Sequence, residues 1–207
     1  MSLALLSRFS HLEILPESDE FIQYFLESQV DERIIGYLSN FTEDLFPKKW
    51  DDNLVINKAN PFPRQWEYAS NLIKDLDTGK DSSIMSSLVA SCVGEETAIR
   101  FMSFSKLANK IKIDEIIATP KVIKNYDSDK QRTSILYAII SALAVKWYDS
   151  DEKKKKLTAE KVVEICGFLS PEFTVAFIKM IINKNSQSLI KAKGGKELME
   201  KLFNFAK

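Results

Sequence analysis

The stretch that decides the fold runs from Asp129 to Tyr148 and reads DKQRTSILYAIISALAVKWY. Its apolar residues recur at steps of one, three and four, which is the spacing of one face of an α-helix. The residues on this face are Ile135, Leu136, Ile139, Ile140, Leu143, Ala144 and Trp147. A stripe of this length needs other helices to cover it, so we expect its neighbours to be helical.

The flanking segments show the same period. Asp19 to Gln29 places apolar residues on one face, and Asp31 can cap a following helix that continues the spacing. Further along, Thr158 is a good cap for a helix over 159–169, and Ser170 precedes a proline at a first helical position. A glycine pair at 194–195 separates the last expected helix from these. The chain therefore reads as helical on both sides of the central stripe.

Strand signals are confined to two short stretches, Phe9 to Leu15 and Asn53 to Asn57. Hairpin turns of the Asn-Gly type are absent from the sequence, so neither stretch has an evident sheet to join. The expected fold class is mainly α: a helical bundle with one or two short N-terminal strands and a second, C-terminal helical group.

The composition excludes several function classes. The 207 residues include 29 basic and 29 acidic side chains, a balance that gives no bulk attraction to nucleic acid or acidic lipid. Cys92 and Cys166 lie in apolar helical patterns and are expected to be buried thiols, and His11 is the only histidine, so we expect no metal site. No apolar stretch approaches the roughly 20 residues that cross a bilayer, and no signal peptide is evident, which favours a cytoplasmic protein.

Enzyme chemistry within the chain is not expected. Glu95 and Glu96 are adjacent on a helix and point apart, and they follow Gly94, where acids favour a helix amino end. The single histidine has no partner nearby in the sequence for a catalytic triad. The lysine run 153–156 directly follows acidic residues and is expected to be a solvated loop.

Four short segments carry a resemblance to a known family. LALLSRFSHLEI (3–14) is similar to the end of the nucleotide-binding core of AAA+ ATPases. DERIIGYLSNFTEDLF (31–46), FPRQWEYASNLI (62–73) and LVASCVGEETAIRFMSF (88–104) are similar, in order and spacing, to the helical lid of MoxR-like and dynein-related AAA+ ATPases. The resemblance extends from Leu3 to about Phe104 and fades afterwards. Its most specific parts are the Pro-Arg-x-Trp and Gly-Glu-Glu segments.

The resemblance implies a domain order and site residues. Residues 1–16 would be the tail end of an ATPase core, 17–110 the lid-like helical domain, and 111–207 a C-terminal helical region. Arg8 would be a candidate arginine finger, and Arg64 a candidate sensor-2 residue that binds cofactor phosphate. The implied partners are the chain's own ATPase core and neighbouring ring subunits, with the remodelled protein unidentified.

The chain departs from the family in one essential respect. It has no Gly-x-x-x-x-Gly-Lys-Ser/Thr loop, because its Gly-Lys pairs at 79–80 and 195–196 lack the upstream glycine and the following hydroxyl. It also has no apolar strand ending in paired acids to hold magnesium. No cofactor is therefore expected in this chain, and ATP and Mg²⁺ are implied only for a full-length parent. We expect a carboxyl-terminal part of a longer ATPase.

Two interpretations of Arg64 stay open. As a sensor, it projects from a helix amino end that already favours an anion, after Pro63 has set the first turn. Alternatively, it stacks on Trp66 or Tyr68 or faces solvent. The whole chain likewise has an alternative function, a free-standing helical interaction or adaptor module that binds no nucleotide.

Overall fold

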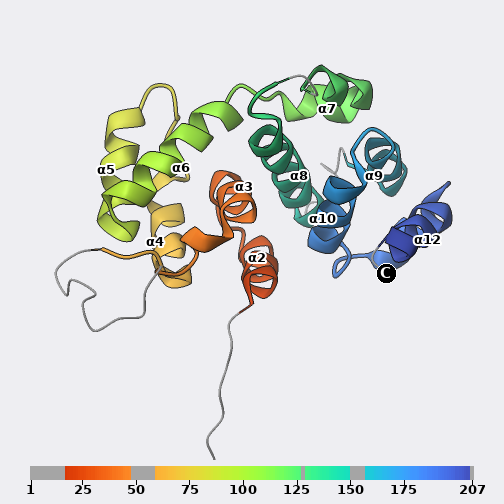
Figure 1. Cartoon of the computed structure of the whole chain (residues 1–207), viewed down its shortest axis with the longest axis horizontal. Helices are drawn as coiled ribbons and strands as arrows, with labels where there is room; N and C mark the ends of the chain where they lie inside the picture. The colour runs from red at the N-terminus through yellow and green to blue at the C-terminus, as the bar shows by residue number, and fades with distance from the viewer. Residues whose placement is uncertain (1–16, 48–58, 127–128, 150–156, 206–207) are drawn as a thin grey trace, which may run out of the picture.

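The structure is a computed structural model that describes residues 17–47, 59–126, 129–149 and 157–205 (Figure 1). These residues form helices joined by turns and loops and contain no strand. The predicted mainly α fold is therefore confirmed. The two predicted strands, Phe9 to Leu15 and Asn53 to Asn57, lie outside the described residues, as does Arg8.

The helices fall into two sets along the chain. The first helical group comprises α2 (Ser18–Glu27), α3 (Glu32–Asn40), the 3₁₀ turn η1 (Thr42–Asp44), α4 (Pro63–Ile73), α5 (Ser82–Val93) and α6 (Glu95–Ala108). The second helical group comprises α7 (Ile113–Ala118), η2 (Pro120–Tyr126), α8 (Arg132–Tyr148), α9 (Ala159–Cys166), α10 (Pro171–Ile181), α11 (Ser186–Lys191) and α12 (Gly195–Phe205).

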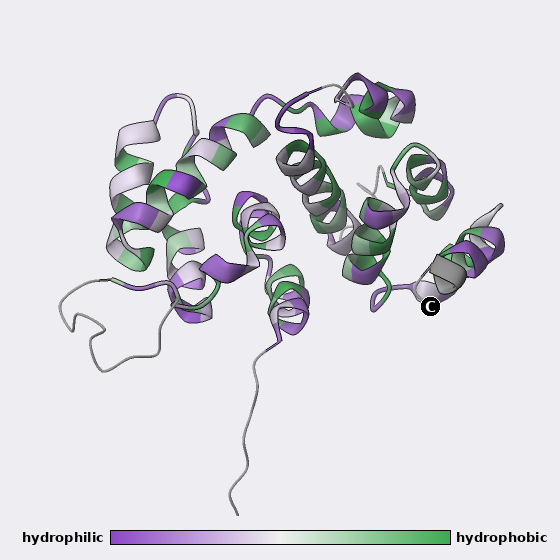
Figure 2. Ribbon diagram, viewed as in Figure 1, coloured by the Kyte–Doolittle hydropathy of each residue, from purple (hydrophilic) through white to green (hydrophobic). Residues whose placement is uncertain are grey.

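Helix α8 is the predicted central helix, and it begins at Arg132, three residues after the predicted start. Every residue of the predicted stripe is buried, and so are Ala138, Ser141, Ala142 and Tyr148 on other faces. Helix α3 packs against one side of α8, and α10 packs against another. Figure 2 shows hydrophobic residues along α8, as expected for a helix covered on several sides.

Gly36 of α3 faces both α6 and α8. A Cβ atom on Gly36 would lie 3.1 Å from Cζ of Phe104 of α6, which would have to shift, and 3.5 Å from Cα of Ala138 of α8, which is ordinary contact. The buried apolar residues form one continuous cluster from Ile22 to Leu189. The core is thus continuous across residue 110, and the division into 17–110 and 111–207 stays a prediction.

The predicted helix starts are mostly explained by their caps. The Asp31 carboxylate accepts a hydrogen bond from the Arg33 backbone N–H at 2.9 Å, and the Thr158 hydroxyl accepts one from the Lys161 N–H at 3.3 Å. Ser170 occupies the N-cap position of α10, but its side chain makes no capping hydrogen bond. Helix α12 begins at Gly195, where a Cβ atom would meet the Leu189 carbonyl oxygen at 1.9 Å.

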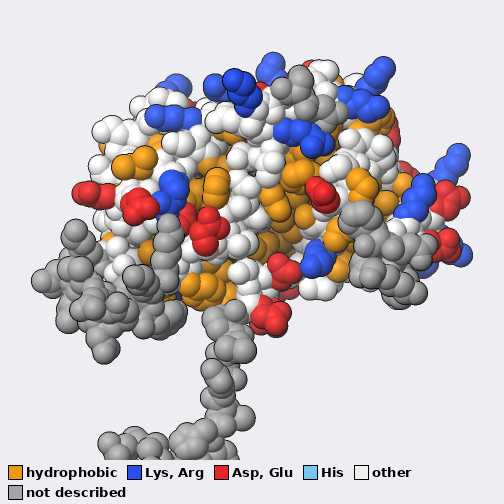
Figure 3. All heavy atoms as spheres, in the orientation of Figure 1, with side chains coloured by type: hydrophobic (Ala, Val, Ile, Leu, Met, Phe, Trp, Pro, Cys, Tyr) orange, Lys and Arg blue, Asp and Glu red, His pale blue; other side chains and the backbone are white. Residues whose placement is uncertain are grey.

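The surface charge is unevenly distributed even though the net charge is zero. On the face shown in Figure 3, basic side chains gather along the edge that holds the end of α6, α7 and η2. The exposed lysines of this stretch are Lys106, Lys110, Lys112, Lys121 and Lys124. Because exposed Asp114 and Glu115 lie in the same stretch, the edge is mixed in charge and not a continuous basic groove.

Among the described helices, none combines the length and apolar composition required to cross a bilayer.

Candidate functional site

The candidate site is centred on Arg64, in the first turn of α4. Pro63 is the first residue of the helix, and Phe62 before it has extended backbone angles. The Arg64 side chain is exposed, its Nε donates a hydrogen bond to the Tyr68 hydroxyl at 3.0 Å, and its guanidinium lies 5.7 Å from the Tyr68 ring centroid. The exposed position at a helix start suits the sensor interpretation, and the Tyr68 contact suits the alternative. The role of Arg64 stays a prediction.

The next residues of α4 are anchored by Trp66. Its ring is fully buried, with the centroid 5.6 Å from that of Tyr37 and 5.8 Å from that of Phe101. Its indole Nε1 donates a hydrogen bond to the Asp44 backbone carbonyl at 2.9 Å. The first turn of α4 is therefore joined to η1 by a buried hydrogen bond and to α3 and α6 by aromatic packing.

Asp44 is a buried acid that holds several partners. Its carboxylate accepts two hydrogen bonds from Arg100 of α6, from Nη2 at 2.6 Å and from Nε at 2.9 Å. The Tyr37 hydroxyl donates to the same carboxylate. The hydrogen bond to Asp44 raises the pKa of Arg100, while burial, followed by the bond to Asp44, raises the pKa of Tyr37. Arg100 and Tyr37 therefore stay protonated at neutral pH, and together with Trp66 they form the amino-end clamp of α4 around Asp44.

A second ion pair holds the other end of α4. Arg33 binds the Asp31 carboxylate through Nε at 2.8 Å and Nη2 at 2.6 Å. The same guanidinium donates to the carbonyl oxygens of Ile73 at 2.9 Å and Leu76 at 3.0 Å. A cation is favourable at the carboxyl end of a helix because the last carbonyls lack helical partners. Asp31 and Arg33 thus form the carboxyl-end clamp of α4.

The backbone before α4 is also held. Gly94, between α5 and α6, has φ of +91°, and a Cβ atom there would lie 2.8 Å from the Ala59 carbonyl oxygen. Only glycine combines this backbone angle with such a close approach. The Gly-Glu-Glu segment therefore contacts the chain four residues before Pro63, the first residue of the Pro-Arg-x-Trp segment. The acids Glu95 and Glu96 open α6, as predicted.

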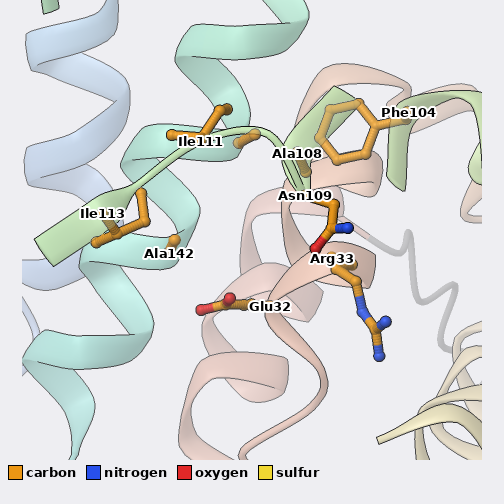
Figure 4. A pocket seen from close by; sticks show the side chains of 9 residues that line it. Glu32, Arg33, Phe104, Ala108, Asn109, Ile111, Ile113 and Ala142 are labelled. Carbon is orange, nitrogen blue, oxygen red and sulfur yellow. The ribbon is translucent and has the colours of Figure 1, made fainter. Parts of the chain in front are cut away.

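A small hollow lies between α3, the end of α6 and α8 (Figure 4). Its volume is about 120 Å³, well below the roughly 300–1,000 Å³ of typical small-molecule sites. In Figure 4 the Glu32 side chain extends toward Ala142 of α8, and the Arg33 guanidinium points away from the hollow. Partial removal from water raises the pKa of the Glu32 carboxyl, and the negative charge of Asp31 also raises it. The hollow has room for a few waters or one side chain, and not for a nucleotide.

Sequence reasoning identified Arg64 but missed the two clamps. Asp44 stands among apolar residues at 41, 45 and 46, which is a signal for a buried acid. Its partner Arg100 is 56 residues away, and a single sequence gives no means of pairing them. Asp31 was expected only as a cap, and its pairing with Arg33 adds a second role.

Comparison of the chain with protein-family models, with curated proteins and with solved structures found no match. Within the described residues, no three His, Cys, Asp or Glu side chains come together as a set of metal ligands. The functional assignment therefore depends on the residues of the chain itself.

Proposed function

We propose that this chain is the lid and C-terminal helical region of a MoxR-like AAA+ ATPase. It would couple the nucleotide state to ring assembly and to the remodelling of a partner protein. The observation that carries the proposal is the placement of Arg64, exposed in the first turn of a helix that partly buried ion pairs hold at both ends. A permanently charged, forked side chain at a helix amino end is well suited to bind a terminal phosphate.

The present contact of Arg64 does not oppose this role. Among the described residues, no carboxylate forms an ion pair with Arg64, and Tyr68 is its only hydrogen-bond partner there. A cation–π contact at an exposed site is worth about 0.5–1 kcal/mol, so a phosphate can displace it at small cost. Because both ends of α4 are anchored to other helices, a movement of α4 on phosphate binding would also move α3 and α6.

The rest of the machinery would come from other parts of the assembly. ATP and Mg²⁺ would be bound by a nucleotide-binding core that belongs to the same parent protein. Arg8 would project toward the nucleotide of a neighbouring ring subunit, and the protein would act in the cytoplasm. The chain itself would supply the phosphate sensor and the rigid helices that move with it.

A second candidate function is a free-standing helical interaction module without nucleotide. It is favoured by large apolar side chains exposed on adjacent helices, Ile84 of α5 at 59% and Ile99 of α6 at 64%. Isolated apolar residues on a surface are common, so this observation is weaker than the placement of Arg64.

The coding sequence upstream of Met1 separates the two candidates. The ATPase proposal predicts an open frame that encodes a strand, a Gly-x-x-x-x-Gly-Lys-Ser/Thr loop and an acidic strand end before Leu3. The protein expressed from that frame should hydrolyse ATP in the presence of Mg²⁺, whereas the 207-residue chain alone should not. A stop codon or an unrelated domain directly upstream would contradict the ATPase proposal and support the interaction module.

A further inference from the structure

We infer that Asp44, Arg100 and Trp66 are positioning residues that fix the first turn of α4, and with it the point from which the Arg64 side chain projects. This inference rests on the proposed function of Arg64. The three residues come from η1, α6 and α4, and they are linked in one hydrogen-bonded chain. Through these hydrogen bonds, α6 holds the first turn of α4 in place.

Asp44 links Arg100 to Trp66 because it accepts hydrogen bonds with two separate groups. Its carboxylate binds the guanidinium of Arg100, and its backbone carbonyl accepts the indole N–H of Trp66. Trp66 lies two residues after Arg64 in the same turn of α4. A shift of the Trp66 ring therefore moves the backbone that carries Arg64.

Burial makes this link stiff. Asp44 is 1% exposed and Trp66 is fully buried, so neither can exchange its protein contacts for water. Loss of one partner would leave a charge or a polar group buried and unpaired, which is strongly unfavourable. Arg100 also binds Glu96, but that carboxylate is 82% exposed, and exposed pairs contribute little. Asp44 is thus the partner that determines where Arg100 lies.

The backbone segment that precedes α4 is held by the start of α6. Gly94 immediately precedes α6, and its close approach to Ala59 blocks movement of the segment before Pro61 toward α6. Phe62, at the N-cap position, has no side chain able to cap the helix. Among the described contacts, those with η1 and α6 hold the start of α4, and no side-chain capping hydrogen bond is found there.

A sensor residue needs this kind of support. A charged fork must be placed within about 0.5 Å of its productive position, and a misplacement of about 1 Å can slow a reaction about a hundredfold. Tyr68, the residue that contacts Arg64 directly, is itself exposed and cannot supply such precision. The buried hydrogen bonds through Asp44 fix the helix turn from which Arg64 reaches its target.

The test is a double-mutant cycle for ATP turnover in the full-length protein. Trp66→Phe removes the hydrogen bond to Asp44 and keeps an aromatic ring, and Arg100→Lys keeps the charge but loses the fork. Each is combined with Arg64→Ala and measured at a temperature where all variants are folded. Trp66→Phe leaves a small cavity but keeps an aromatic ring in the core, and Arg100→Lys keeps a cation, so the test does not depend on an Asp44 variant that fails to fold.

If the inference holds, Trp66→Phe and Arg100→Lys each slow turnover about ten- to a hundredfold when Arg64 is present. In the Arg64→Ala background each should slow turnover less than about twofold, because residues that act through one another are not additive. The control Val162→Ala, in the buried face of α9, should lower the melting temperature and leave turnover unchanged.

Two results would overturn the inference and leave the proposed function standing. Arg64→Ala could slow turnover while folded Trp66→Phe and Arg100→Lys proteins keep the parental rate. Alternatively, both variants could slow turnover equally with and without Arg64, which would mean that they act independently of it. Parental turnover by Arg64→Ala alone would instead refute the proposed function and this inference together.

Discussion

The interiors of the two helical groups are built differently. In the first group, two Asp–Arg pairs are largely buried, and the rings of Tyr37, Trp66, Phe101 and Phe104 form an aromatic cluster. Among the described residues of the second group, the buried polar side chains are Ser141 and Thr174, and the buried rings of Trp147 and Tyr148 each donate a hydrogen bond. The rest of that described core is apolar, and the ion pairs Lys161–Glu164 and Lys146–Asp114 lie at the surface. Directional contacts hold helices in one geometry, whereas apolar faces tolerate repacking at similar volume. The first group is thus the part of the molecule built for precise placement of a side chain.

The largest expected effect is in the apolar group. Ile139→Asp would bury an unpaired charge in the middle of α8, at a fully buried position, and should destabilise the chain by more than about 4 kcal/mol. Urea denaturation followed by circular dichroism measures this loss, with Ile139→Val as the control at about 1 kcal/mol. If Ile139→Asp unfolds at the same urea concentration as the parent, the α8 stripe is not part of the core. The description of the second group as an apolar core would then be wrong.

A smaller but still large effect is expected at the amino-end clamp. Asp44→Ala leaves the Arg100 guanidinium without its buried partner, and breaking a buried pair typically costs about 3–5 kcal/mol. Because Arg100 is 32% exposed and can still bind Glu96, we expect about 3 kcal/mol. Glu96→Ala is the matched control, since it removes the exposed partner and should cost less than about 1 kcal/mol. Equal losses for the two variants would mean that burial of Asp44 does not matter.

The pH dependence of stability tests whether Tyr37 of the first group is held as a neutral phenol. The pKa of Tyr37 is raised by burial and by the bond to Asp44, so the folded state favours the neutral phenol. This contribution is complete below the ordinary tyrosine pKa of about 10 and is lost as the pH rises above it, because the unfolded chain ionises first. The free energy of unfolding of the parent should therefore fall relative to that of Tyr37→Phe between pH 9 and 11, by roughly 1 kcal/mol. A constant difference over this range would show that Tyr37 is not held as described.

The sequence allowed the apolar half of the structure to be predicted better than the polar half. The stripe from Ile135 to Trp147 follows helical periodicity, which one sequence displays directly, and all of it is buried. The burial of Ala138 and Ser141 on other faces was not predicted, because it depends on which helices pack around α8. The link between Asp44 and Arg100 depends on contacts between distant segments, and periodicity does not encode such pairs.

The candidate site shows the same limit. Pro63 and Arg64 could be placed at a helix start from local sequence alone, and the structure has them there. What holds that helix start came only from the three-dimensional arrangement, through Asp44, Arg33 and the approach of Gly94 to Ala59.

The measurement that tests the account most directly is ATP turnover by Arg64→Ala in the full-length protein, together with its melting temperature. We predict a slowing of about ten- to a thousandfold, as when one charge-stabilising donor is removed, with a stability change within about 0.5 kcal/mol. Arg64→Lys should rescue poorly, because a flexible point charge does not replace a fork. The control is Lys74→Ala, an exposed cation at the other end of α4, which should leave both turnover and melting unchanged. Parental turnover with a clearly lower melting temperature in Arg64→Ala would contradict the account and make Arg64 a structural residue.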